Sequence, residues 1–111
     1  MTSISGRTYK VSWTRKSTAT LRNIHRYVTE VKQEPQSANE LYLALWKFGN
    51  ELGTKPKGYP RLDDQKEASQ QYFQAVYKKN YVFIFRLDER KHMLYITNVH
   101  HAAQHPSKRL K

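Results

Sequence analysis

The residues with the clearest chemical potential lie in the last third of the chain. An imidazole has an ordinary pKa of about 6.5, so a histidine can give or take a proton near neutral pH. Lysine and arginine bind phosphate oxygens through charge-assisted hydrogen bonds. The pattern therefore predicts either acid–base chemistry on a phosphodiester or the binding of an anion. The residues concerned are His100, His101, His105, Lys78, Lys79 and Arg86.

Two other roles remain open for the three histidines. They can be surface residues, or they can pack against the edge of a sheet. The spacing H-H-x3-H could also supply three nitrogens to a zinc ion, but no cysteine or acidic ligand lies close in the sequence. We expect no metal and no cofactor.

The net charge of +11 on 111 residues is concentrated at the two ends of the sequence. Residues 1–29 carry six basic residues and no acid, and residues 71–111 carry eight basic and two acidic residues. Residues 30–70 are close to neutral. If the two ends meet in the fold, one face is strongly basic and suits an anionic partner. The alternative is a solvated surface that keeps a small protein soluble.

Length and composition limit the class of protein. A chain of 111 residues with 38% hydrophobic residues can close one small core, which predicts a single domain over 1–111 with flexible ends at 1–7 and 107–111. There is no cysteine, so disulfides and thiolate zinc sites are excluded. The sequence shows no secretory pattern and no apolar run near the roughly 18 residues of a membrane span, so we expect a cytoplasmic protein.

The elements that would position these residues begin with a strand and a helix. Apolar residues alternate from Tyr9 to Trp13, which is typical of a strand with one buried face. Apolar residues then recur at helical spacing as far as Val31, and Ser17 is the expected N-cap of this helix.

A second helix follows after a short connection. Ser37 and Glu40 form a capping-box pattern that predicts its start, and Gly53 predicts a left-handed C-terminal end. Because the connection is only a few residues long, the two helices should form an antiparallel hairpin.

The rest of the chain reads as a loop and three strands. Residues 54–71 show little periodicity, and three strand patterns follow at 72–77, 81–85 and 93–99, with polar turns between them. The predicted fold class is α+β in the order β-α-α-β-β-β: an N-terminal strand, an antiparallel helical hairpin and a three-stranded antiparallel meander that joins the first strand in one sheet.

Several short motifs occur in a fixed order along this pattern. They are YKVSWT, Leu21-x-x-Ile24-x-x-Tyr27-Val28, Pro35, Ala38-x-x-Leu41-x-x-x-Leu45, Lys55-Pro56, Gly58-Tyr59-Pro60, the run from Asn80 to Leu87, and Asn98-Val99-His100. In order and spacing the chain resembles the RelE/ParE superfamily of toxins from bacterial toxin–antitoxin modules, from Tyr9 to about Pro106. The resemblance implies a small toxin that is held inactive by a cognate acidic antitoxin.

The resemblance implies one of two activities. RelE-like members cleave mRNA in the ribosomal A site without a metal, and ParE-like members block DNA gyrase. RelE-like members typically carry arginines where this chain has Val82 and Ala102, and ParE-like members often carry arginines where it has Gln74 and Gln104. The long helical hairpin is ParE-like. We therefore expect a gyrase inhibitor, with a ribosome-dependent mRNA endonuclease as the alternative.

The two activities use the candidate residues differently. In a nuclease His100, His101 and His105 would be the acid and base, whereas Lys78, Lys79 and Arg86 would contact phosphate or target in either case. A third hypothesis is a non-toxic, basic nucleic-acid-binding module. Its support is the aromatic residues interleaved with these lysines: Tyr72, Phe73, Tyr77 and Tyr81.

Two aromatic residues widen the apolar arc of the second helix. Tyr42 and Trp46 can pack on the first helix or remain free for the antitoxin. An acidic, extended antitoxin that folds on binding would lay an amphipathic helix in such a groove.

Overall fold

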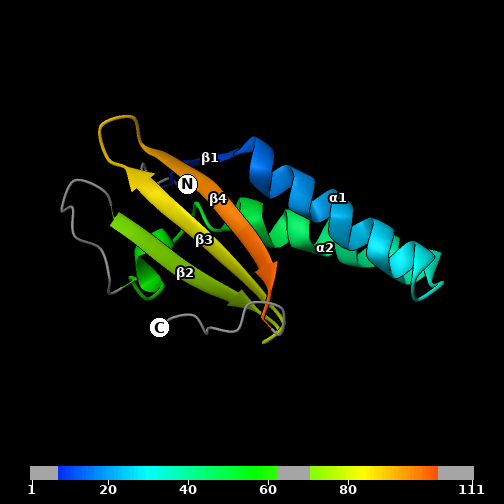
Figure 1. Cartoon of the computed structure of the whole chain (residues 1–111). Coiled ribbons are helices and arrows are strands. Elements are labelled where there is room, and N and C mark those ends of the chain that lie inside the picture. Colours follow the sequence, from blue (N-terminus) through cyan, green and yellow to red (C-terminus); the bar gives the residue numbers. More distant parts are fainter. Residues whose placement is uncertain (1–7, 63–70, 103–111) are drawn as a thin grey trace.

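A computed structural model describes residues 8–62 and 71–102 of the chain. The predicted order β-α-α-β-β-β is confirmed (Figure 1), with one short 3-10 helix, η1, inside the expected loop. None of the helices in these two ranges is both long and apolar enough to cross a membrane. The elements are β1 (Lys10–Trp13), α1 (Arg15–Glu30), α2 (Pro35–Glu51), η1 (Pro56–Gly58), β2 (Gln71–Tyr77), β3 (Tyr81–Asp88) and β4 (Met93–His101).

The four strands form one sheet in the order β1-β4-β3-β2. β2, β3 and β4 make the predicted antiparallel meander, and β1 joins it beside β4 in the parallel direction. A parallel partner needs a long crossover connection, and the helical hairpin lies in that connection. The predicted fold class is therefore confirmed, and the sheet is mixed.

The core lies between one face of the sheet and the helical hairpin. Strand β3 alternates in burial, and its residues Phe83, Phe85 and Leu87 are buried. They pack with Leu21 of α1 and Leu45 of α2, which are fully buried. In Figure 1 α1 and α2 lie side by side and lead away from the sheet, so their far ends extend beyond it. Among residues 8–62 and 71–102, no helix packs on the opposite face of the sheet.

Helix α1 begins three residues earlier than the sequence predicts. Thr14 is the N-cap, and its hydroxyl accepts a hydrogen bond of 3.2 Å from the Ser17 amide. The prediction that Ser17 caps the helix is wrong, because Ser17 is fully buried and donates its hydroxyl to the Thr14 carbonyl at 2.9 Å. The helix follows β1 directly, so its first turn already packs against the sheet.

The capping-box prediction for α2 is also wrong. The helix starts at Pro35, where a missing N–H costs nothing because the first amides of a helix have no partner within it. Its N-cap is Glu34, whose side chain makes no capping bond, and the Ala38 amide donates to the Glu34 carbonyl at 2.9 Å.

Gly53 has a different role from the one predicted. Its φ is not in the left-handed region, so it does not end α2 as expected. It is buried and lies against the start of β1, where the Tyr9 amide donates to the Gly53 carbonyl at 2.8 Å. A Cβ at this position would collide with the Tyr9 carbonyl oxygen. The glycine is therefore required by close backbone packing.

Candidate functional site

The face of the sheet opposite the helices carries apolar and polar side chains with one arginine, Arg86, and we call it the open face. Side chains alternate along each strand, so the neighbours of the buried residues point away from the helices. Strand register places Arg86 between Tyr72 and Tyr95, and Val82 beside His100. The open face comprises Ser12, Tyr72, Gln74, Val76, Val82, Ile84, Arg86, Tyr95, Asn98 and His100.

Four of the predicted site residues meet at one end of this sheet. Strand β4 continues through His101, so His100 and His101 lie within it and not after it as expected. His101 pairs with Tyr81 of β3, and their rings meet edge to face at 5.0 Å between centroids. Lys78 and Lys79 form the turn that leads into Tyr81. We call these four residues, with Tyr81, the dilysine end.

The turn that carries the two lysines has an unfavourable backbone conformation. Lys78 has φ 51° and Lys79 has φ 65°, and the Asn80 amide donates to the Tyr77 carbonyl at 3.0 Å. Two central residues with positive φ are typical of a type I′ hairpin turn, for which Asn-Gly is preferred. An L-residue loses about 1–2 kcal/mol in the left-handed region. The chain thus keeps two lysines where the backbone disfavours them.

Tyr81 of the dilysine end is partly buried, which changes the acidity of its phenol. Partial burial raises the pKa of its phenol above the ordinary value of 10.0. The phenol therefore stays protonated at neutral pH, where it can donate a hydrogen bond but cannot serve as a base.

Arg86 lies apart from the dilysine end. Arg86 is four residues along β3 from Val82, and Val82 pairs with His100. At the rise of an extended strand, the distance along β3 between Arg86 and Val82 is about 13 Å. Its guanidinium carbon lies 4.4 Å from the centroid of the Tyr95 ring, a cation–π contact. The structure thus separates the predicted cations into two groups on one sheet.

The two aromatic residues of α2 differ in their surroundings. Trp46 packs against Trp13 of β1, with ring centroids 4.3 Å apart, and belongs to the rim of the core. Tyr42 meets the His25 ring edge to face at 5.4 Å, and His25 shares a 2.7 Å hydrogen bond with the Asn39 side chain. Tyr42, His25 and Asn39 line an open groove between the two helices. The other residues of this groove are Arg22, Arg26, Thr29 and Glu30.

The remaining predicted ligand, His105, lies outside the described residues. Within residues 8–62 and 71–102, no group of three or more histidine, cysteine, aspartate or glutamate side chains could hold a metal ion. The sequence interpretation missed Tyr95, which contacts Arg86, and the groove residue His25. Only strand register reveals the first, and only the packing of α1 on α2 reveals the second.

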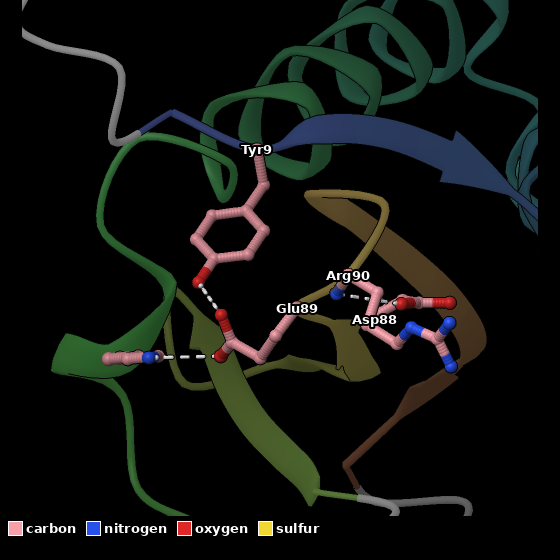
Figure 2. A network of polar contacts seen from close by, with 5 residues as sticks. Tyr9, Asp88, Glu89 and Arg90 are labelled. Carbon is pink, nitrogen blue, oxygen red and sulfur yellow. Dashed lines mark hydrogen bonds and ion pairs between the residues drawn. The ribbon is translucent and has the colours of Figure 1, made fainter.

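A polar cluster lies at the opposite end of β3, in the turn before β4 (Figure 2). The Tyr9 hydroxyl donates to one carboxylate oxygen of Glu89 at 2.7 Å, and the Lys57 ammonium lies 2.9 Å from the other. The His92 ring stacks on the Tyr9 ring at 4.6 Å. The cluster joins three segments far apart in the sequence: the start of β1, η1 and the β3–β4 turn.

This cluster predicts a pH dependence of stability. The hydrogen bond from Tyr9, and then the Lys57 ammonium, hold the pKa of Glu89 below its ordinary value of 4.5. The folded state thus favours the carboxylate, so the contribution is present above pH 4.5 and is lost as pH falls through the lower, folded pKa. Since Glu89 and Lys57 are largely exposed, we expect about 0.2–1 kcal/mol.

Thermal unfolding of Glu89→Gln tests this contribution. At neutral pH the variant should melt slightly below the wild type, and the gap should close in acid because the wild-type carboxyl is then also uncharged. Glu40→Gln removes the same charge from the exposed surface of α2 and serves as the control. A gap for Glu89→Gln that stays constant from neutral to acid pH would contradict the role given to the carboxylate.

The comparisons with known proteins show which fold this is. No family model matches the sequence, and no curated protein matches it. Two solved structures are similar at 18% identity over 86% of this chain. One is a chain of the toxin–antitoxin complex RelBE2 from Mycobacterium tuberculosis, with a TM-score of 0.60 and 93% of that chain covered. The other belongs to the chromosomal ParDE toxin–antitoxin system of P. aeruginosa, with a TM-score of 0.63 and 97% covered.

This chain shares the fold of these two chains, and the fold that the sequence resemblance implies is thereby confirmed. The two TM-scores differ little, so the fold is about equally similar to the RelBE2 chain and to the ParDE chain.

Proposed function

We propose that the chain is the toxin of a type II toxin–antitoxin module and acts in the cytoplasm as a ParE-like inhibitor of DNA gyrase. The observation that carries this choice is the separation of the candidate residues. Arg86 is held against Tyr95, about 13 Å along the sheet from the level of His100. Arg86, apart from the lysine turn on an otherwise apolar and polar sheet face, suits the binding of a large target better than catalysis at one point.

Neutralisation by an acidic antitoxin is supported by charge and by the shape of the hairpin. The chain carries +11, and the groove between α1 and α2 places Arg22 and Arg26 beside the apolar ring of Tyr42. An amphipathic acidic helix could pair its carboxylates with the arginines and pack an apolar side chain on the tyrosine. Both solved neighbours come from systems that contain an antitoxin.

The alternative, a ribosome-dependent mRNA endonuclease, has its own support in the dilysine end. Cleavage would need a base for the ribose 2′-hydroxyl, charge on the phosphate and an acid for the leaving 5′-oxygen. His100 and His101 lie in the strand beside the lysine turn and could supply proton transfer, and Lys78 and Lys79 could supply the charge.

Controlled expression with two readouts tests the proposal. A gyrase inhibitor should cause filamentation and loss of negative supercoiling while mRNA on translating ribosomes stays intact. Degraded mRNA would instead identify the endonuclease. Normal growth, with protein present and no antitoxin expressed, would favour a non-toxic nucleic-acid-binding module.

The histidines give a sharper prediction within the same experiment. His100→Ala and His101→Ala should leave toxicity within a few-fold of the wild type, because a binding surface does not depend on one proton-transfer group. Loss of a general acid or base typically reduces a rate by about 10²–10⁴-fold. Growth rate after induction, corrected for protein level, is the measurement. A loss of toxicity of that size in either variant, with normal thermal stability, would contradict the binding mode.

A further inference from the structure

The lysine turn between β2 and β3 has a conformation that its sequence does not favour. Positive φ at Lys78 and Lys79 would suit asparagine and glycine far better. The chain does contain an asparagine here, but at Asn80, one position too late to occupy the left-handed pair. Unfavourable backbone conformations that persist are concentrated at sites with a function. The turn is therefore a place where side-chain chemistry outweighs backbone preference.

The surroundings of the turn indicate what that chemistry is. Both lysines are exposed, and the Lys78 ammonium lies 5.6 Å from the centroid of the Tyr77 ring. Tyr81 follows the turn, is partly buried, and meets the ring of His101. Partly exposed rings beside lysines are characteristic of surfaces that bind a nucleic-acid strand, where cations follow the phosphates and rings contact bases.

The other acidic and basic groups on the sheet are consistent with an anion at this end. Asp88, on the same side of β3 as Arg86, is at the opposite end of the strand, where its carboxylate accepts hydrogen bonds from the Arg90 and Lys91 amides. Near the dilysine end, the Lys16 ammonium lies 3.1 Å from the side-chain amide of Asn98 on β4. The cationic surface therefore continues from the turn along β4.

From these observations we infer that the β2–β3 turn is a phosphate-binding tip, in which Lys78 and Lys79 contact successive phosphates of a nucleic-acid backbone beside Tyr77 and Tyr81. This rests on the proposed function and deepens it by giving the ligand class of the dilysine end. The test of this inference needs only the purified chain. Nucleic-acid binding by the turn can therefore be absent from a toxic protein, and it can be present in a non-toxic one.

The decisive variant replaces the turn by the residues that its backbone prefers. Lys78→Asn with Lys79→Gly should raise Tm by roughly 4–8 °C, because positive φ is then favoured. The same variant should bind a short single-stranded RNA and a short DNA duplex about tenfold more weakly near 0.1 M salt. The slope of log Kd against log salt should fall by about 1.4 for the RNA strand and about 1.8 for the DNA duplex, because two phosphates are no longer neutralised by lysines. Fluorescence anisotropy measures both the affinity and the slope.

Three further variants separate charge at the tip from other effects. Lys78→Gln with Lys79→Gln should lose the same affinity without the gain in Tm, and Lys78→Arg with Lys79→Arg should retain binding. The matched control is Lys32→Gln with Lys47→Gln, which removes two exposed lysines from the helical hairpin. This control should keep nearly full affinity.

Comparison of the two probes distinguishes the sources of phosphate, since an RNA strand and a DNA duplex have different salt slopes, about 0.7 and 0.9 per neutralised phosphate. Three results would overturn the inference: wild-type affinity in the Asn-Gly variant, equal losses in the Lys32 and Lys47 control, or equally tight binding of polyglutamate. The first result would mean that the turn does not contact the nucleic acid. The second would mean that binding depends only on the net charge of the protein, and the third would assign the tip to an acidic protein partner.

Discussion

Gly53→Ala should destabilise the protein strongly, by about 1–3 kcal/mol or more. The added methyl group would have to occupy the position of the Tyr9 carbonyl oxygen and would also press on a methyl of Val11. Both belong to the segment that starts β1, whose Tyr9 amide is bonded to the Gly53 carbonyl. The backbone cannot yield without separating β1 from the end of α2. Urea unfolding, monitored by far-UV circular dichroism, should show a lower midpoint.

Gly58→Ala is the matched control, because a Cβ at Gly58 would meet nothing within 4 Å. Its free energy of unfolding should stay within about 0.5 kcal/mol of the wild type, as for most surface substitutions. If the two alanine variants unfold at the same urea concentration, the close packing of Gly53 on Tyr9 is not a determinant of stability.

Phe83→Ala is the second large effect, with an expected loss of about 3–5 kcal/mol. The side chain is fully buried, and its ring meets Phe48 of α2 at 5.0 Å and Trp13 of β1 at 6.2 Å between centroids. Phe83 therefore joins the central strand both to the helical hairpin and to the edge of the sheet. The expected loss is a large fraction of the roughly 5–15 kcal/mol that stabilises a typical domain.

Val82→Ala changes the adjacent residue on the open face and is the control for this prediction. It should lower the free energy of unfolding by about 1 kcal/mol or less, the range of strand preference. Equal losses for Phe83→Ala and Val82→Ala would mean that the core does not lie on the helix side of the sheet. Chemical denaturation of both variants is the measurement.

The sequence predicts the fold well because periodicity and burial agree in most elements. Alternation in β1 and the apolar run in β3 mark strands, and the short connection before α2 fixes an antiparallel hairpin. The helix starts were predicted less well. Ser17 and Ser37 both have the right chemistry for an N-cap. Helix α1 nevertheless starts after Thr14, which caps it directly at the end of β1, and helix α2 starts at Pro35, whose ring suits the first helical position.

The candidate site could be predicted in part. A short turn brings its two flanking strands together, so Lys78 and Lys79 had to lie near the start of β3, where Tyr81 pairs with Tyr77. Their meeting with His101 depends on the register of β3 on β4, which includes an irregularity between Ile84 and Phe85. The separation of Arg86 follows from the same register. Local sequence patterns do not fix such a register, and they do not encode positive φ at a lysine.

The most direct test of the central claim is a supercoiling assay with purified gyrase, relaxed plasmid, ATP and the purified chain. The chain should inhibit supercoiling in a dose-dependent way, and the cognate antitoxin added beforehand should restore supercoiling. The same preparation should leave mRNA intact on translating ribosomes. Full gyrase activity at saturating toxin, together with cleavage of ribosome-bound mRNA, would contradict the proposal and assign the dilysine end to an endonuclease.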